Sequence, residues 1–189
     1  TVLIKRIDIW VMDHAMQLLK EFSTKHQFKG KWCINFSGVE LQNENFPVAL
    51  CGLIETHQVD PSMIELEITE TSLVQNDNRA NQILKALRAL GLNLSLDDFG
   101  TGYTAFNQLF HYPADTLKID RSFIWGLFTE NSQNAEEMLS IMQKLAQLYN
   151  LRVVAEGVET AEQLKYLQDN HCDYVQGFYL SKPLSVEAF

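Results

Sequence analysis

The chain has 189 residues, of which 46% are hydrophobic and 21% charged, a globular composition that argues against disorder. It carries 15 Lys and Arg against 24 Asp and Glu, a formal net charge of −9. Because an acidic surface repels phosphates, we expect no binding of nucleic-acid polymers and no direct contact with a membrane. No apolar run approaches the length of about 18 residues that a membrane span needs. We therefore expect a cytoplasmic chain, whose parent protein can still be membrane-anchored.

Short apolar segments alternate with segments of helical periodicity from one end of the chain to the other. Strands are predicted over 31–36, 63–68, 92–97, 116–119, 151–155 and 173–176. Helices are predicted over 7–22, 47–57, 77–90, 104–110, 133–149 and 160–170, with Gly91 as a stop and Thr160–Gln163 as a capping box. This alternation predicts one α/β domain with a parallel sheet.

Every predicted strand carries polar or charged residues at its C-terminal end. In chain order they are Asn35, Glu67 with Glu70, Asp97 with Asp98, Lys118 with Asp120, Glu156 and Gln176. A parallel α/β barrel gathers its active site at this end, whereas an open doubly wound sheet uses a single switch point. Eight strands close such a barrel, and the chain starts within an amphipathic pattern. We therefore expect a TIM-barrel-like fold, truncated at its N-terminus, with six of eight strands present and two before Thr1.

Four of these residues, Glu67, Asp97, Asp98 and Glu156, are carboxylates that we expect to converge. Carboxylates that lie close together repel each other, and a bound divalent cation removes that repulsion. Oxygen ligands, including the amides of Asn35 and Gln176, favour Mg²⁺ or Mn²⁺ over zinc or copper. Such ions polarise a phosphoryl oxygen and activate water, and two of them can clamp an in-line displacement. Lys118 adds a fixed positive charge that can hold the water or the phosphate.

Each residue also has a simpler explanation. Asp97 and Asp98 can form an ordinary turn, Glu67 can lie exposed on an edge strand, and Lys118 can pair with Asp120. Glu156 and Gln176 can merely begin loops. Their shared placement favours a common site over these separate explanations.

Three further features of the sequence accompany that site. Glu70, Asp120 and Glu159 are expected to orient ligands or loops, with plain surface charge as the alternative. The segment 99–103, Phe-Gly-Thr-Gly-Tyr, is a glycine-rich loop that permits a close backbone approach. Cys33, Cys51 and Cys172 fit no zinc spacing, and they are expected to be small buried hydrophobic residues.

Six segments resemble the EAL family of bacterial cyclic-di-GMP phosphodiesterases, in the order of the family and over nearly the whole chain. They are INFS at 34–37, ELEITE at 65–70, DDFGTGY at 97–103, KIDRSF at 118–123, AEGVET at 155–160 and QGF at 176–178. The resemblance implies a modified TIM barrel that hydrolyses cyclic-di-GMP to linear pGpG with Mg²⁺ or Mn²⁺, in bacterial second-messenger signalling.

The resemblance also implies a role for each matching residue. Metal-site positions correspond to Asn35, Glu67, Asp97, Asp98 and Glu156. Lys118 corresponds to the lysine beside the catalytic water, Gln176 to a further active-site residue, and Glu70 to the glutamate that supports the glycine-rich loop.

The Glu-Ala-Leu signature of the family does not occur in this sequence, and we expect it upstream of Thr1. Its glutamate is a metal ligand in the family. The alternative is therefore an inactive EAL domain that acts as a cyclic-di-GMP receptor or a protein-interaction module. A homodimer, and a GGDEF or sensor domain in the parent protein, are compatible with the resemblance.

Overall fold

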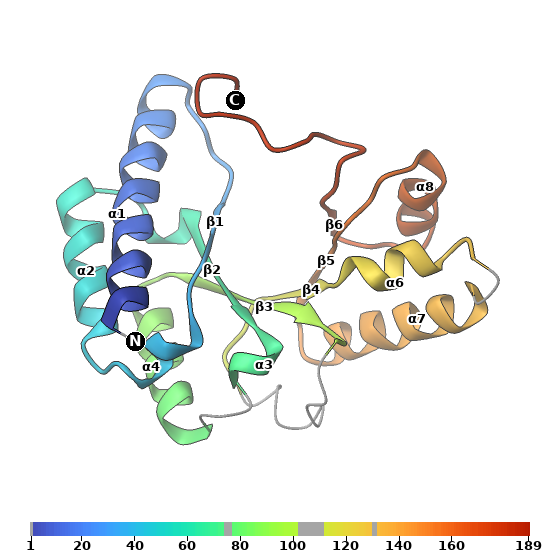
Figure 1. The fold of residues 1–189 in the computed structure, drawn as a ribbon, viewed down its shortest axis with the longest axis horizontal. Coiled ribbons are helices and arrows are strands. Elements are labelled where there is room, and N and C mark those ends of the chain that lie inside the picture. Colours follow the sequence, from blue (N-terminus) through green and yellow to red (C-terminus); the bar gives the residue numbers. More distant parts are fainter. Residues whose placement is uncertain (1, 74–76, 102–111, 130–131) are drawn as a thin grey trace. The chain divides into compact units, whose positions relative to one another are not determined.

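A computed structural model describes residues 2–73, 77–101, 112–129 and 132–189 (Figure 1). Its strands are β1 (Trp32–Asn35), β2 (Ile64–Thr69), β3 (Asn93–Phe99), β4 (Thr116–Ile119), β5 (Arg152–Ala155) and β6 (Tyr174–Val175). Each begins and ends close to its predicted range. The alternating apolar segments are therefore strands, as the sequence predicts.

The sheet has six strands, in the order β1-β2-β3-β4-β5-β6. β1 pairs parallel with β2, with Asn35 opposite Glu67. β4 pairs parallel with β5, with Lys118 opposite Val154, and β5 pairs parallel with β6. Parallel neighbours that follow each other in the chain need crossover connections, which the helices supply. The α/β class is confirmed.

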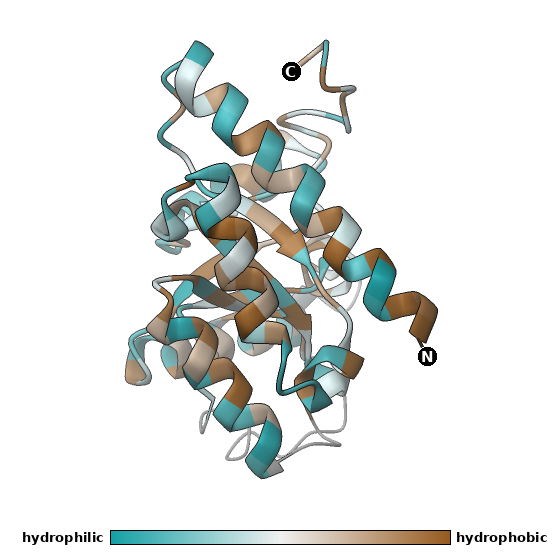
Figure 2. Ribbon diagram, turned by 90° about the vertical axis from the view of Figure 1, so that its left-hand side faces the viewer, coloured by the Kyte–Doolittle hydropathy of each residue, from teal (hydrophilic) through white to brown (hydrophobic). Residues whose placement is uncertain are grey.

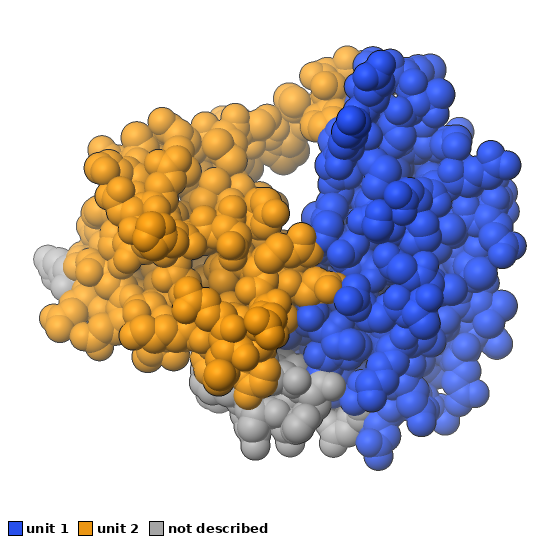
Figure 3. All heavy atoms as spheres, turned by 180° about the vertical axis from the view of Figure 1, so that it is seen from behind, with its two compact units in different colours: residues 1–96, 102–114 blue, residues 97–101, 115–189 orange. Residues whose placement is uncertain are grey.

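The chain divides into two compact units (Figure 3). Unit 1 comprises residues 1–96 and 102–114, and unit 2 comprises residues 97–101 and 115–189. The boundary falls within β3, so Asp97 and Asp98 belong to unit 2.

Unit 1 packs its helices around a core of aliphatic and aromatic side chains. The helices are α1 (Val2–Lys25), η1 (Gly38–Gln42), α2 (Phe46–His57), η2 (Pro61–Met63), α3 (Glu70–Leu73) and α4 (Asp77–Ala89). Apolar and polar residues alternate in patches along α1 (Figure 2), and its buried face includes Met12, Met16 and Leu19. Helix α1 is longer than the predicted 7–22, because its periodicity continues in both directions. Gly91, with φ +90°, follows α4 as the predicted stop.

Unit 2 contains α6 (Arg121–Gly126), α7 (Ser132–Leu148) and α8 (Ala161–Asp169). Thr160 and Gln163 form the predicted capping box at the start of α8. The short helices α3 and α6 were not predicted, because neither is long enough to show a helical period. The predicted helix over 104–110 lies outside the described residues. No helix in the described ranges is long and apolar enough to cross a membrane.

The prediction of buried cysteines is wrong for Cys33, which is exposed, while Cys51 and Cys172 are partly buried. In β1 the side chains alternate, so Cys33 shares its face with the exposed Asn35, and Ile34 points into the core. An apolar neighbourhood in sequence therefore did not predict burial at this position.

Candidate functional site

Lys118 lies between two carboxylates of unit 2. Its Nζ is 2.9 Å from Asp97 Oδ1 and 2.7 Å from Glu156 Oε1. The three side chains are exposed by only 6%, 12% and 17%, so the charges interact in a medium that screens them poorly. One ammonium thus neutralises part of the repulsion between two carboxylates.

The strand register explains why Lys118 and Glu156 meet. Lys118 is opposite Val154 in β5, and the next pair is Ile119 with Ala155. The backbone continues this pairing past the strand end, where Glu156 N donates to Ile119 O at 3.1 Å. Because side chains alternate along a strand, Val154 and Glu156 share one face. The observed burial agrees, since Val153 and Ala155 are buried and Glu156 is partly buried.

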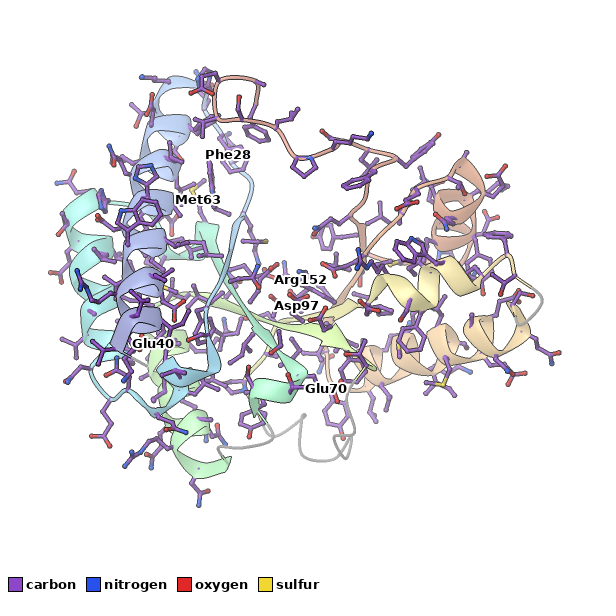
Figure 4. The ribbon with its side chains drawn as sticks, viewed as in Figure 1. Phe28, Glu40, Met63, Glu70, Asp97 and Arg152 are labelled. Carbon is purple, nitrogen blue, oxygen red and sulfur yellow. The ribbon has the colours of Figure 1, made fainter. Side chains whose placement is uncertain are left out.

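Asp98 departs from strand geometry in a way that brings it to the same cluster. Its φ is +55°, in the left-handed region that Asp tolerates better than most residues. Consecutive residues of a regular strand point to opposite faces, so this turn of the backbone lets Asp97 and Asp98 approach a common point. Figure 4 marks Asp97 on β3.

Burial raises the pKa of the Asp98 carboxyl, and the negative charges of Asp97 and Asp120 raise it further. Lys118 and Arg121 oppose this increase. The ionised form of the carboxyl is therefore destabilised by its surroundings, and a bound divalent cation would stabilise it.

Asp97, Asp98 and Glu156 fit a divalent cation. Each offers a carboxylate oxygen, and the three oxygens lie within 4.8 Å of one another. Carboxylates without imidazole or thiolate suit Mg²⁺ or Mn²⁺. The short distances between these oxygens and the raised pKa of Asp98 both favour a bound cation. The arrangement of the carboxylates therefore suits a divalent cation, as does their chemical type.

Two glycines let the turn after β5 pack closely against its neighbours. Gly157 has φ +70°, and a Cβ at this residue would lie 2.3 Å from the Cβ of Arg121. A Cβ at Gly177 would lie 2.1 Å from the oxygen of Val158. Gln176 N donates to Ala155 O at 2.8 Å. Gln176 is consequently held beside the strand end that carries Glu156.

A pocket of about 340 Å³ opens beside this cluster, at the lower end of the volumes typical of ligand pockets. Its lining comprises Asp98, Asp120, Arg121, Trp125, Glu156, Gly157, Glu159, Gln176, Gly177 and Phe178. The Arg121 guanidinium lies 4.9 Å from the centroid of the Trp125 ring. The pocket therefore combines carboxylates with one cation and exposed aromatic surface.

Five lining residues were not predicted as site residues: Arg121, Trp125, Gly157, Gly177 and Phe178. Arg121 directly follows Asp120, and its charge and its place in the KIDRSF segment are the signals in the sequence that could have identified it. Trp125 and Phe178 are 44% and 57% exposed, which their apolar character does not predict.

In unit 1 the structure joins Asn35 and Glu67. They are opposite each other in the register of β1 and β2, and Asn35 Nδ2 donates to Glu67 Oε2 at 3.0 Å. Glu67 is buried, contrary to the alternative of an exposed edge residue. Glu70 is also buried, as the first residue of α3 rather than the end of a strand (Figure 4).

The other secondary positions have identifiable local contacts. Asp120 caps α6, where its side chain accepts from Ser122 N at 2.9 Å. Glu159 N donates to Gln163 Oε1 at 2.7 Å, which ties the pocket rim to the start of α8. Gly100 of the glycine-rich loop has φ +94°, and a Cβ there would lie 2.4 Å from Met142 Cε. Gly102 and Tyr103 lie outside the described residues.

Comparison with known proteins decides the family. The EAL domain model matches residues 1–183. The chain belongs to the EAL domain family. The resemblance seen in the sequence and the TIM-barrel-like fold class are thereby confirmed.

Relatives of this EAL domain include proteins named as phosphodiesterases. The chain is 36% identical over 186 residues to cyclic di-GMP phosphodiesterase NbdA of Pseudomonas aeruginosa. The aligned region covers 98% of this chain and 24% of NbdA. The structure matches a complex of the PaMucR phosphodiesterase with c-di-GMP, with a TM-score of 0.91 and 33% identity over 99% of this chain and 75% of that one.

A third match is the manganese/cy-diGMP complex of Klebsiella pneumoniae BlrP1, with a TM-score of 0.82 and 27% identity. It covers 92% of this chain and 43% of BlrP1. The chain spans about a quarter of the length of the curated relatives it matches.

Proposed function

We propose that this EAL domain hydrolyses one phosphodiester bond of cyclic-di-GMP to give linear pGpG, with Mg²⁺ or Mn²⁺ as cofactor. The observation that carries the proposal is the Asp97–Lys118–Glu156 cluster beside the pocket. Relatives named as cyclic-di-GMP phosphodiesterases support the same reaction.

Asp97, Asp98 and Glu156 are the proposed metal ligands of unit 2, on the strength of their converging oxygens. Asn35 and Glu67, at the C-terminal ends of β1 and β2, are proposed as further ligands, so that two ions can be held. Divalent ions so bound would polarise the phosphoryl oxygen and activate water.

Lys118 has a separate proposed role. Its ammonium already donates to Asp97 and Glu156, so it fixes both carboxylates and carries protons next to the reacting phosphate. Gln176 can orient the phosphate or the water through its amide, because its backbone is held against Ala155.

The pocket is the proposed place for part of the nucleotide. A net charge of −9 opposes an anionic ligand, so local cations must supply the attraction. Arg121 provides one at the pocket wall, and the metal would provide more. Glu70, Asp120 and Glu159 are proposed to hold the surrounding loops, which agrees with the α6 cap of Asp120 and the α8 contact of Glu159.

The parent protein is proposed to act in the cytoplasm, where it meets a nucleotide second messenger. One relative is named a bifunctional diguanylate cyclase/cyclic di-GMP phosphodiesterase, which supports a GGDEF or sensor domain beside this one. A homodimer is a further proposal, and light scattering of the purified protein at several concentrations tests it. A monomer at all concentrations would contradict it.

Chromatography of the reaction products tests the main proposal. The protein is incubated with cyclic-di-GMP and Mg²⁺ or Mn²⁺, and again with EDTA. We expect pGpG only with metal, and at least about 100-fold less from Glu156→Gln, which loses a ligand charge. Metal binding without any pGpG would instead favour the alternative, an inactive domain that acts as a cyclic-di-GMP receptor.

A further inference from the structure

Trp125 makes a contact that the proposed mechanism does not use. It lies in α6, and its indole Nε1 donates a hydrogen bond to the backbone oxygen of Gly157 at 3.1 Å. The two residues are 32 positions apart in the chain, so the bond is tertiary. It joins α6 to the turn that directly follows Glu156.

This turn is held by backbone bonds on its other sides. Glu156 N donates to Ile119 O at 3.1 Å, and Val158 N donates to Gln176 O at 3.0 Å. The Gly157 oxygen accepts the hydrogen bond from the Trp125 indole. The indole therefore completes the attachment of the turn.

Gly157 is the residue at which the turn can most easily change conformation. Its φ of +70° is accessible to glycine without a penalty, and glycine also has the widest choice of alternative angles. The lack of a side chain lets the turn sit against Arg121, since a Cβ would lie 2.3 Å from the Arg121 Cβ. Gly157 directly follows Glu156, whose carboxylate is a proposed metal ligand. A contact from outside the turn is therefore needed to hold this flexible residue in one conformation.

We propose that Trp125 is a positioning residue, whose indole N–H holds the Gly157 peptide so that the Glu156 carboxylate stays directed at Lys118 and Asp97. The role of Glu156 as a metal ligand rests on the proposed function. The ordering of the turn by the Trp125 indole does not depend on it. Arg121 supports the arrangement, because its guanidinium covers one face of the indole ring. The ring is thereby fixed in the orientation that aims Nε1 at Gly157.

The variant Trp125→Phe keeps an aromatic ring under Arg121 and removes the donor. Trp10→Phe is the matched control, since Trp10 is 63% exposed in unit 1 and stacks on His14. Two measurements are made on each protein: amide hydrogen exchange by mass spectrometry, and calorimetric titration with Mn²⁺. Hydrogen exchange reports how well the turn is ordered in the absence of metal. The titration reports whether the carboxylates are positioned to bind the ion.

We expect Trp125→Phe to exchange about three- to tenfold faster at Val158 and Glu159, the protected amides of the turn, with little change elsewhere. The dissociation constant for Mn²⁺ should rise by about the same factor, and Trp10→Phe should match the wild type in both measurements.

Unchanged exchange in the turn would overturn the inference. So would faster exchange throughout the molecule with unchanged Mn²⁺ affinity, because that pattern indicates a purely structural role. If the wild type itself binds no Mn²⁺, the proposed function fails, and the exchange of the turn alone decides whether Trp125 positions it.

Discussion

Lys118 is the residue on which the candidate site depends most. A buried ammonium between two carboxylates replaces part of the attraction that a metal would otherwise supply. Removal of one member of a buried charge cluster leaves the others uncompensated, and this costs more than the intact cluster contributes.

Replacement of Lys118 by Met keeps the apolar stem and removes the charge. In EDTA we expect a loss of about 3 kcal/mol in the free energy of unfolding, because Asp97 and Glu156 then face each other without the ammonium. Added Mn²⁺ should restore more stability to this variant than to the wild type. Thermal denaturation with and without Mn²⁺ measures both effects.

Lys165→Met is the control for that variant. Lys165 pairs with Asp169 one helical turn away, and both side chains are well exposed, so its loss should cost no more than about 0.5 kcal/mol. A Lys118→Met protein as stable as the wild type in EDTA would contradict the proposed charge balance.

Glu40, in unit 1, is a second residue with an unusual environment (Figure 4). It is fully buried, Asn43 Nδ2 donates to its Oε2 at 2.6 Å, and its Oε1 has no hydrogen-bond partner among the described residues. Burial raises the pKa of this carboxyl above its usual value of 4.5. The folded state thus favours the protonated form.

The raised pKa of Glu40 fixes the direction of a pH effect. Its stabilising contribution is fully present below pH 4.5 and is lost as the pH rises through the raised pKa. Glu40→Gln should therefore stabilise the protein at pH 7 by about 1 kcal/mol, and the gain should shrink as the pH falls. Urea denaturation at a series of pH values measures it.

Glu21→Gln is the matched control, since Glu21 is exposed and its pairing with Lys25 lowers its pKa. It should show no gain at neutral pH. A stabilisation by Glu40→Gln that does not change with pH would exclude ionisation of Glu40 as the cause.

At the residue scale, the sequence predicted which carboxylates come together, but it did not predict the backbone conformation that lets them do so. The convergence of Asp97, Asp98 and Glu156 followed from their position at strand ends. The positive φ of Asp98, which lets consecutive residues meet, has no signature in an Asp-Asp pair. Nor did the sequence indicate that Trp125 would bond to Gly157, because tertiary contacts between distant residues leave no local pattern.

At the scale of elements, the strands were predictable because each is a short apolar run closed by a polar residue. The long helices were predictable from their period and from caps such as Thr160 with Gln163. Helix α6 was missed, although the Asp120 cap precedes it. Its six residues are too few to show amphipathic periodicity.

The junction of β6 with the turn after β5 depends on Gly177. A Cβ at this position would lie 2.1 Å from Val158 O and 2.3 Å from Val158 N, both of which are backbone atoms. We expect Gly177→Ala to lower the free energy of unfolding by about 2 kcal/mol or more, since the backbone must move to accept the methyl group.

Gly52→Ala is the control at the same scale. Gly52 lies within α2, and nothing lies within 4 Å of its Cβ position. This substitution should stabilise the protein by about 0.5–1 kcal/mol through helix propensity. Chemical denaturation compares the two variants, and equal effects would show that the close approach at Gly177 is not a constraint.

For the whole molecule, the relevant property is a net charge of −9 in a protein proposed to bind an anion. The sequence alone suggested how an acidic protein can bind an anion, namely through a bound metal ion that attracts it. The parallel α/β fold was predictable from the alternation of elements. The division into two units was not, because the boundary lies inside β3 rather than in a linker.

The charge predicts that cyclic-di-GMP binding depends on divalent metal. In EDTA the affinity should fall by at least about tenfold, since the acidic field then opposes the ligand and Arg121 is the main cation of the pocket wall. Calorimetric titration with the nucleotide, in Mg²⁺ and in EDTA, measures the difference. Equal affinity in both would show that the protein binds the nucleotide without metal.

The most direct test of the account is a calorimetric titration of the wild type and of Asp97→Asn with Mn²⁺, with the exposed Asp169→Asn as control. The account predicts that the wild type and Asp169→Asn bind Mn²⁺ alike, and that Asp97→Asn, folded by circular dichroism, binds it at least about tenfold more weakly. It is contradicted if the wild type binds no Mn²⁺ at millimolar concentration, or if Asp97→Asn binds it as tightly as the wild type does.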